Sequence, residues 1–118
     1  MSIFSISEYE DIERLWITNQ TETMNLEFKK ELSNDNKEIA KDISAFANSK
    51  GGVIIYGITE DHGRAIQSKG IPITNNSERI QQIISCSTMP EVPIEIETIN
   101  VPVQTGSSTH EFVVVKIP

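Results

Sequence analysis

The segment 53–59, with the sequence VIIYGIT, constrains the fold more than any other part of the chain. Side chains of a β-strand alternate between two faces, and in this segment both alternating sets are apolar. Such a strand is stable only in the interior of a sheet that is covered on both sides. The sequence therefore predicts a central strand with one packing layer on each of its faces.

An amphipathic helix is predicted immediately before this strand. Its apolar side chains recur at the spacing of one helix face, at Ile39, Ile43, Phe46 and Ala47. The polar residues 33–36 offer several N-caps. Gly51 stands where the chain needs a left-handed residue, which glycine adopts without a Cβ penalty. Gly51 and Gly52 are therefore interpreted as the structural stop between helix and strand.

The rest of the chain adds further elements in a recognisable order. The pattern predicts a helix at 7–17 with Ser7 as its N-cap, followed by a strand of three to five residues within 24–31. After the central strand it predicts a turn at 60–64 and a loop at 67–76. A third helix is capped by Asn75 and ended by Pro90 and Pro93, and an antiparallel pair of strands follows at 94–103 and 110–117. The order α-β-α-β-α-β-β favours an α+β fold, in which a mixed sheet of four to five strands packs against two to three helices.

Composition narrows the class of protein. The chain has 118 residues, which suits one domain, and we expect that domain to be part of a longer protein because the sequence stops just after an apolar strand. No apolar run is long enough to span a membrane. A single cysteine, Cys86, fits a reducing cytoplasm, and its place beside an apolar helix face predicts a buried side chain rather than a nucleophile. The formal net charge of −7 opposes strong non-specific binding to nucleic acid.

Several common sites are absent from the sequence. The glycines of NSKGGVIIYG lack the spacing and the lysine of a P-loop, and no dinucleotide-binding fingerprint is present. Neither His62 nor His110 has a second ligand at helical spacing, so the usual zinc sites are not indicated.

Acidic residues offer a more specific possibility. Glu22 and Glu27 lie beside the first predicted strand, and Glu60 and Asp61 follow the central strand. If these strands are neighbours, the carboxylates converge at one end of the sheet, where they would suit Mg²⁺ or Mn²⁺. A continuous strand would put Glu22 and Glu27 on opposite faces, so they share a site only if Glu22 precedes the strand. The alternative is a set of solvated surface acids.

Two stretches of the sequence resemble a known family. ETMNLEFKKE and IAKDISAFANSKGGVIIYGITEDHG are similar to the Schlafen AlbA-type domain, which is also described as a DNA-binding domain of divergent AAA type. The resemblance extends over residues 21–118. Its structural motif is carried by Phe46, Asn48, Gly51, Gly52 and Gly57. The chain departs from the family pattern at Thr23 and Ser49, and its acidic turn is about one residue longer, so either Glu60 or Asp61 matches the family's acid.

The resemblance implies more than one function. The first is a nucleic-acid-binding, regulatory domain of a larger bacterial or archaeal protein, with a further domain linked at its C-terminal end. Its phosphate contacts would be six basic residues, Lys29, Lys30, Lys37, Lys41, Lys50 and Arg64. The competing interpretation is that these residues are simply solvated.

The second implied function is a metal-dependent endoribonuclease that acts on structured RNA. In that case Glu22, Glu27 and Asp61 (or Glu60) would hold Mg²⁺ or Mn²⁺, and Lys29 would face the scissile phosphate. No cofactor is implied otherwise. A third function, protein interaction or homo-oligomerisation, rests on the acidic balance and on the open sheet edge that the final strand pair would offer.

Overall fold

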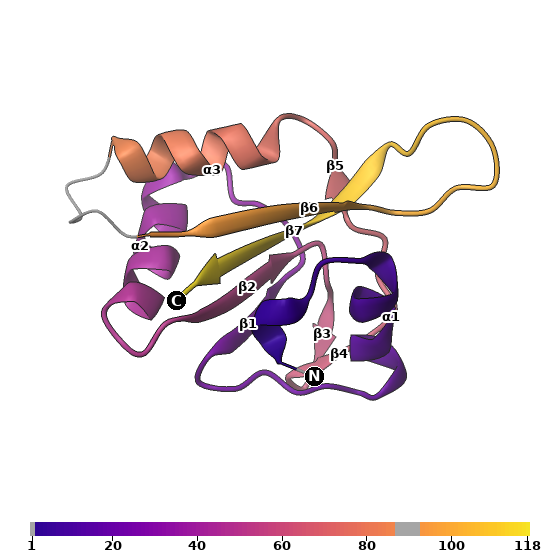
Figure 1. Ribbon diagram of the computed structural model, residues 1–118, viewed down its shortest axis with the longest axis horizontal. Coiled ribbons are helices and arrows are strands. Elements are labelled where there is room, and N and C mark those ends of the chain that lie inside the picture. The colour runs from indigo at the N-terminus through magenta and orange to yellow at the C-terminus, as the bar shows by residue number, and fades with distance from the viewer. Residues whose placement is uncertain (1, 87–92) are drawn as a thin grey trace.

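The computed structural model describes residues 2–86 and 93–118. Its helices and strands, in chain order, are η1 (Ile3–Ser5), α1 (Tyr9–Ile17), β1 (Leu26–Lys29), α2 (Asn36–Ala47), β2 (Gly52–Tyr56), β3 (Glu60–Asp61), β4 (Arg64–Ala65), β5 (Ile71–Pro72), α3 (Asn76–Ser85), β6 (Glu95–Asn100) and β7 (His110–Ile117). Within these residues, three α-helices and a mixed five-stranded sheet confirm the predicted α+β fold (Figure 1). Of the two prolines predicted to end the third helix, Pro90 lies outside the described residues.

β2 lies in the interior of the main sheet, between β1 and β7. β1 runs parallel to β2, with Leu26 opposite Val53 and Lys29 opposite Tyr56. β7 runs antiparallel to β2, and both β5 and β6 pair antiparallel with β7. All five residues of β2 are buried, as predicted for a central strand.

Both faces of the sheet are covered by helices. One face packs against η1 and α1 in a core that includes Ile12 and Phe112. The other face packs against α2 and α3 in a core that includes Ile43 and Ile80. Figure 1 shows α2 and α3 along the left and upper borders of the sheet and α1 at the lower right. The two cores are separated by the sheet, whose β2 contributes alternate side chains to each.

The β1–α2–β2 unit brings the family-like segments together. Asp35 caps α2, because its carboxylate accepts a hydrogen bond from a backbone N–H of the first turn at 2.9 Å. After the helix ends, Gly51 adopts a φ of +80° and donates its N–H to the carbonyl oxygen of Phe46 at 2.9 Å. A Cβ on Gly52 would lie 2.7 Å from the carbonyl oxygen of Asn25. The two glycines therefore serve the turn and the close approach of the chain before β1.

The segment after β2 differs from its prediction. The predicted turn at 60–64 is a small hairpin, in which Glu60 pairs with Ala65 and Asp61 with Arg64. The predicted loop at 67–76 contains β5, which pairs with the start of β7. These strands are two residues long, and their pairing depends on the neighbouring backbone rather than on an alternating pattern of their own.

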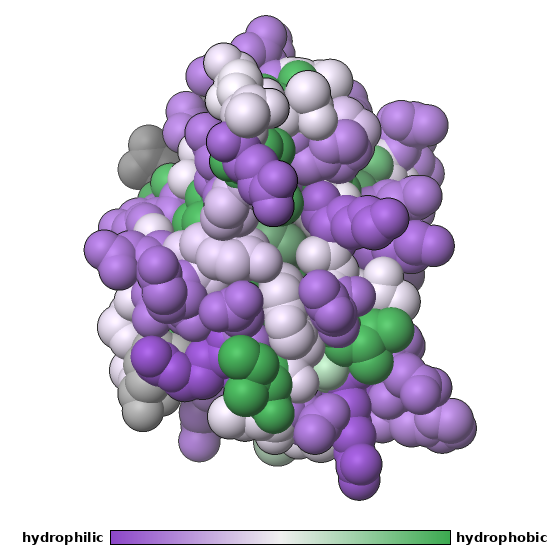
Figure 2. All heavy atoms as spheres, turned by 90° about the vertical axis from the view of Figure 1, so that its right-hand side faces the viewer, coloured by the Kyte–Doolittle hydropathy of each residue, from purple (hydrophilic) through white to green (hydrophobic). Residues whose placement is uncertain are grey.

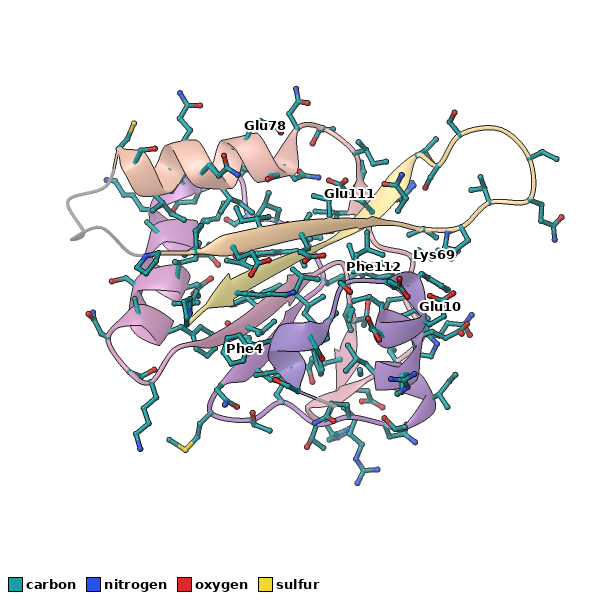
Figure 3. The ribbon with its side chains drawn as sticks, viewed as in Figure 1. Phe4, Glu10, Lys69, Glu78, Glu111 and Phe112 are labelled. Atoms are coloured by element: carbon teal, nitrogen blue, oxygen red, sulfur yellow. The ribbon has the colours of Figure 1, made fainter. Side chains whose placement is uncertain are left out.

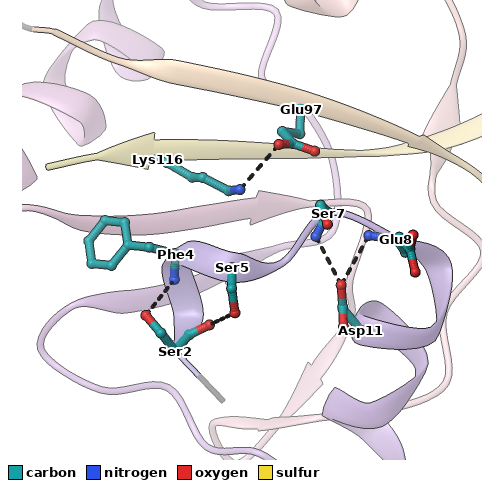
Figure 4. Close-up of polar contacts among 8 residues, drawn as sticks. All are labelled: Ser2, Phe4, Ser5, Ser7, Glu8, Asp11, Glu97 and Lys116. Atoms are coloured by element: carbon teal, nitrogen blue, oxygen red, sulfur yellow. Dashed lines mark hydrogen bonds and ion pairs between the residues drawn. The ribbon is translucent and has the colours of Figure 1, made fainter.

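The first helix begins two residues later than predicted. Its N-cap is Glu8 rather than Ser7. A carboxylate oxygen of Asp11 accepts hydrogen bonds from the N–H groups of Ser7 at 3.0 Å and Glu8 at 3.1 Å (Figure 4). These backbone bonds lower the pKa of Asp11 against the opposing effect of its burial. Asp11 therefore fixes the entry into α1.

Hydrophobic side chains are dispersed on one face of the molecule. Figure 2 shows the right-hand face of the molecule, where isolated hydrophobic residues lie among hydrophilic ones. Within the described part of the chain, every helix is too short or too polar to cross a bilayer.

Cys86 is exposed, so the prediction of a buried side chain is wrong. The reason is that α3 ends at Ser85, which leaves Cys86 at the C-cap, beyond the buried face.

Candidate functional site

An open pocket of about 400 Å³ lies between β1 with its preceding turn and helix α2. Carboxylates reach it from both sides: Glu22 and Glu27 from the β1 side and Asp42 from α2. Phe46 and Leu26 supply apolar walls. The pocket therefore combines acidic side chains from segments that are distant in the sequence.

The turn before β1 explains how Glu22 and Glu27 reach one pocket. Glu22 precedes the strand, and an isolated bridge between Thr23 and Leu26 turns the chain just after it. The Glu22 carboxylate then accepts a hydrogen bond from the N–H of Phe28 at 2.9 Å. Glu27 lies within β1. The spacing of five residues, which would separate the two side chains in a continuous strand, is thus overcome by the turn.

One lysine is held among these acids. The ammonium nitrogen of Lys29 lies 3.8 Å from a carboxylate oxygen of Glu27 and 3.6 Å from one of Asp42. Burial raises the pKa of Glu27; the negative charges of Asp42 and Glu22 add to that rise, and Lys29 opposes it. Two carboxylates pair with this ammonium group, and Glu22 adds a third negative charge to the pocket, so the pocket has an excess of negative charge, which a bound cation would offset.

Tyr56 is buried close to the same acids. It lies opposite Lys29 in the β1–β2 register and is 2% exposed. Its hydroxyl has no hydrogen-bond partner within the described residues. Burial raises the pKa of Tyr56, and the charges of Asp42 and Glu27 raise it further. A buried hydroxyl without a partner is uncommon in folded proteins.

Asp42 and Tyr56 are not among the site residues that the sequence pattern predicts. Asp42 lies one helical turn before Phe46, and that spacing is the signal that could have placed it at the edge of the buried face. Tyr56 carries the one polar side-chain atom of the apolar run 53–58, which is a weaker signal.

The acids after the central strand lie elsewhere. Asp61 is exposed on the β3–β4 hairpin, and its carboxylate lies 2.8 Å from Nδ1 of His62. The Glu60 carboxylate accepts a hydrogen bond from the N–H of Gly63 at 2.6 Å. Neither side chain lines the pocket. The hairpin nevertheless adjoins the pocket, since the N–H of Glu22 donates to the carbonyl oxygen of Gly63 at 2.7 Å. Among the described residues, no group of three or more His, Cys, Asp or Glu side chains is placed to hold a metal ion.

The other predicted basic residues are exposed. Lys37 and Lys41 lie one turn apart on α2, and Lys41 is one turn before Ala45, which lines the pocket. Lys50 lies in the turn before β2, and Arg64 lies on the β3–β4 hairpin. Lys30 lines a separate hollow beyond the end of β1. The structure therefore pairs Lys29 with two of the pocket acids, places Lys41 near the pocket and leaves Lys30 outside it.

Comparison with known protein families gives a match over most of the chain. The family model described as Schlafen, AlbA_2 matches residues 22–118. The chain belongs to this family. No curated protein matches it. Membership in the Schlafen AlbA_2 family makes this a nucleic-acid-related domain at the level of the family.

Proposed function

We propose that this Schlafen AlbA_2 domain binds nucleic acid as a regulatory, DNA-binding module of a larger bacterial or archaeal protein. The supporting observation is that the two segments with the strongest family resemblance form opposite walls of one pocket. Glu22 and Glu27 belong to the first segment, and Asp42 and Phe46 belong to the second. In this proposal the phosphate backbone lies over the pocket, with Lys37 and Lys41 along its α2 rim.

The charge balance defines how such binding would work. The chain carries 17 acidic and 10 basic residues, so its overall field repels phosphates. Binding then depends on the local lysines, and on a divalent cation between the pocket acids and the phosphates. We therefore expect affinity that falls with salt and rises when Mg²⁺ is present.

A titration with double-stranded DNA and with structured RNA tests this proposal. The measurements are made at low and at moderate salt, each with and without Mg²⁺. The double variant Lys37→Gln/Lys41→Gln should weaken binding and reduce the salt slope by about two, at roughly 0.9 for each lost phosphate contact. The double variant Gln81→Glu/Gln82→Glu on the exposed side of α3 changes the net charge by the same amount and should leave the slope unchanged. Absence of binding at low salt, or binding without a salt slope, contradicts the proposal.

The crowding of carboxylates favours a second candidate, a metal-dependent endoribonuclease. Carboxylate oxygens suit Mg²⁺ and Mn²⁺, which proteins often hold with only one or two carboxylates, the remaining ligands being waters and substrate phosphates. Glu22 and Glu27 would hold the ion, which would supply charge neutralisation at the scissile phosphate. Lys29 would stabilise negative charge on the phosphate, and Asp42 would hold Lys29 in place.

Cleavage of tRNA in the presence of Mn²⁺ separates the two candidates. Glu27→Ala should abolish cleavage if the domain is a nuclease. Asp42→Asn and Asp61→Asn then tell whether the acid inside the pocket or the acid on the hairpin takes part. Equal cleavage by the parent protein and Glu27→Ala, or no cleavage by either, contradicts the nuclease candidate and leaves binding as the function to test.

A further inference from the structure

A second hollow, of about 340 Å³, lies beyond the carboxyl ends of the parallel strands β1 and β2. Its lining includes Lys30, which follows β1, and Gly57 and Thr59, which follow β2. The segment before β5 also lines the hollow, through Ser68, Lys69 and Gly70. Ligands of open α/β sheets commonly bind outside the carboxyl ends of parallel strands. This hollow, named the β1–β2 end pocket, therefore occupies a position that is typical of a ligand-binding site.

Two glycines form part of this pocket. The N–H of Gly57 donates to the carbonyl oxygen of Lys29 at 2.7 Å, and the N–H of Gly70 donates to the carbonyl oxygen of Gly57 at 3.2 Å. A Cβ on Gly57 would lie 2.7 Å from the Cα of Gly70. The two backbones therefore touch without side chains between them, and this part of the wall is bare backbone.

Hydrogen bonds fix the loop that carries Lys69. The N–H of Thr59 donates to Oγ of Ser68 at 2.8 Å, and the Ser68 hydroxyl donates to the carbonyl oxygen of Ile66 at 2.7 Å. The backbone N–H groups of residues 67–69 donate to no residue within the described part of the chain. A loop held in one conformation with unused N–H groups suits an anion.

The charge of the β1–β2 end pocket is opposite to that of the chain. Lys30 and Lys69 line it, and neither forms an ion pair with a carboxylate among the described residues. Among the described residues that line it, Glu31 is the one acid. Figure 3 shows Lys69 on the right-hand side of the molecule. A pocket with two lysines and one glutamate, in a chain of net charge −7, concentrates positive charge at one place.

We propose that the β1–β2 end pocket binds a phosphate group, with Lys30 and Lys69 as its charged contacts. This inference rests on the proposed function for the source of the phosphate, which would be the nucleic-acid strand that crosses the β1–α2 pocket. Lys29 and Lys30 are consecutive, and the first lies among the acids of the β1–α2 pocket while the second lines the end pocket. The end of edge strand β1 thereby joins the two pockets, so that one strand of nucleic acid could contact both.

Amide NMR spectra recorded during two titrations test the proposal. The probes are inorganic phosphate and a short single-stranded oligonucleotide that carries a 5′-phosphate. The amides of Gly57, Thr59, Ser68 and Gly70 should shift in a saturable manner with both probes. The double variant Lys30→Gln/Lys69→Gln should weaken this response at least tenfold. The variant Gln81→Glu/Gln82→Glu has the same net charge, changes no residue of either pocket and should retain the response to both probes.

The outcomes separate the two proposals. The phosphate pocket is overturned if neither probe produces saturable shifts at these four amides. It is also overturned if the double variant Lys30→Gln/Lys69→Gln leaves the shifts unchanged. Oligonucleotide shifts confined to the β1–α2 pocket overturn the assignment of the end pocket to nucleic acid and support the proposed function. A response to inorganic phosphate with no response to any oligonucleotide supports the pocket as a site for a free phosphate and overturns its assignment to nucleic acid.

Discussion

The ammonium nitrogen of Lys29 lies 3.6 Å from a carboxylate oxygen of Asp42, and this ion pair joins the edge strand β1 to helix α2. Both side chains are largely covered, with exposures of 31% and 24%. Asp42 lines the acidic pocket, and the Glu27 carboxylate, which also lines it, competes for the same ammonium group at 3.8 Å. A ligand that draws Lys29 toward a phosphate must therefore compete with two carboxylates.

A double-mutant cycle should detect this ion pair. We expect Lys29→Gln and Asp42→Asn to show a coupling energy of about 0.2–1 kcal/mol in the free energy of unfolding, the range of partly exposed pairs. Urea unfolding of the parent, the two single variants and the double variant gives the value. The same cycle with Lys29→Gln and Glu31→Gln is the control, because Glu31 forms no ion pair with Lys29. A coupling energy equal to that of the control would show that the contact contributes nothing to stability.

The raised pKa of Glu27 predicts a pH-dependent cost to folding. The folded state binds the Glu27 proton more tightly than the unfolded state, so stability falls as pH rises through the interval between the two pKa values and stays low above it. We expect Glu27→Gln to be more stable than the parent protein at neutral pH. The difference should vanish below the ordinary glutamate pKa of about 4.3.

Thermal unfolding of both proteins across this pH range measures the effect. Glu95→Gln, which changes an exposed glutamate of β6, serves as the control for the loss of one negative charge. A Glu27→Gln variant that is less stable than the parent at neutral pH would show that the ion pair with Lys29 outweighs burial and repulsion.

The unpartnered hydroxyl of Tyr56 predicts that this core position tolerates the substitution Tyr56→Phe without loss of stability. Its burial without a hydrogen bond among the described residues carries a desolvation penalty, which phenylalanine would remove while keeping the ring. We expect Tyr56→Phe to leave stability unchanged or to raise it by about 1 kcal/mol. Urea unfolding measures the change. A loss of more than about 1 kcal/mol would mean that the hydroxyl is bonded to water or to an ion in the pocket.

The fold follows from the sequence where long patterns decide the structure. The apolar run of β2 and the spacing of Ile39, Ile43 and Phe46 in α2 are local signals of burial, and both elements form as predicted. The strands β3, β4 and β5 are too short to carry a period of their own. Their backbones pair because the tertiary fold brings a partner strand alongside, which no local pattern reveals.

The candidate site divides in the same way. The position of Glu22 ahead of the strand is the condition under which it can share a pocket with Glu27, and the sequence alone can state that condition. Asp42 enters through the rotation of α2 against β1, which depends on packing of the whole helix. The direction of Asp61 is set by the β3–β4 hairpin, whose register follows from backbone pairing.

The hydrogen bonds that the Asp11 carboxylate accepts before α1 predict that this helix cap stabilises the protein less at acid pH. The lowered pKa means that the unfolded state binds the Asp11 proton more tightly, so this contribution is present above the unfolded-state pKa and is lost as pH falls through the folded-state pKa. We expect Asp11→Ala to reduce stability by about 1 kcal/mol at neutral pH, and by less in acid. Glu10→Ala in the same helical turn is the control in thermal unfolding. Equal losses from the two variants would show that the two backbone bonds do not stabilise α1.

The contact between Gly57 and Gly70 predicts the largest single loss of stability. Gly57 has a φ of +109°, and a Cβ there would lie 2.7 Å from the Cα of Gly70. Gly63 has a φ of +80°, and a Cβ there would meet nothing within 4 Å. Gly63→Ala therefore reports the backbone penalty alone, about 1–2 kcal/mol. Gly57→Ala adds steric overlap with a backbone atom that cannot move independently, which costs about 1–3 kcal/mol more.

Urea unfolding of the two alanine variants measures the extra cost at Gly57, because the difference removes the conformational penalty that the two positive-φ positions have in common. The difference also tests the wall of the β1–β2 end pocket, which is bare backbone only if Gly57 and Gly70 touch. We expect Gly57→Ala to weaken the response of the Thr59 and Ser68 amides to inorganic phosphate, while Gly63→Ala preserves it. Equal stability of the two variants would mean that the backbones separate readily, and the pocket would then lack the rigid wall that its proposed use requires.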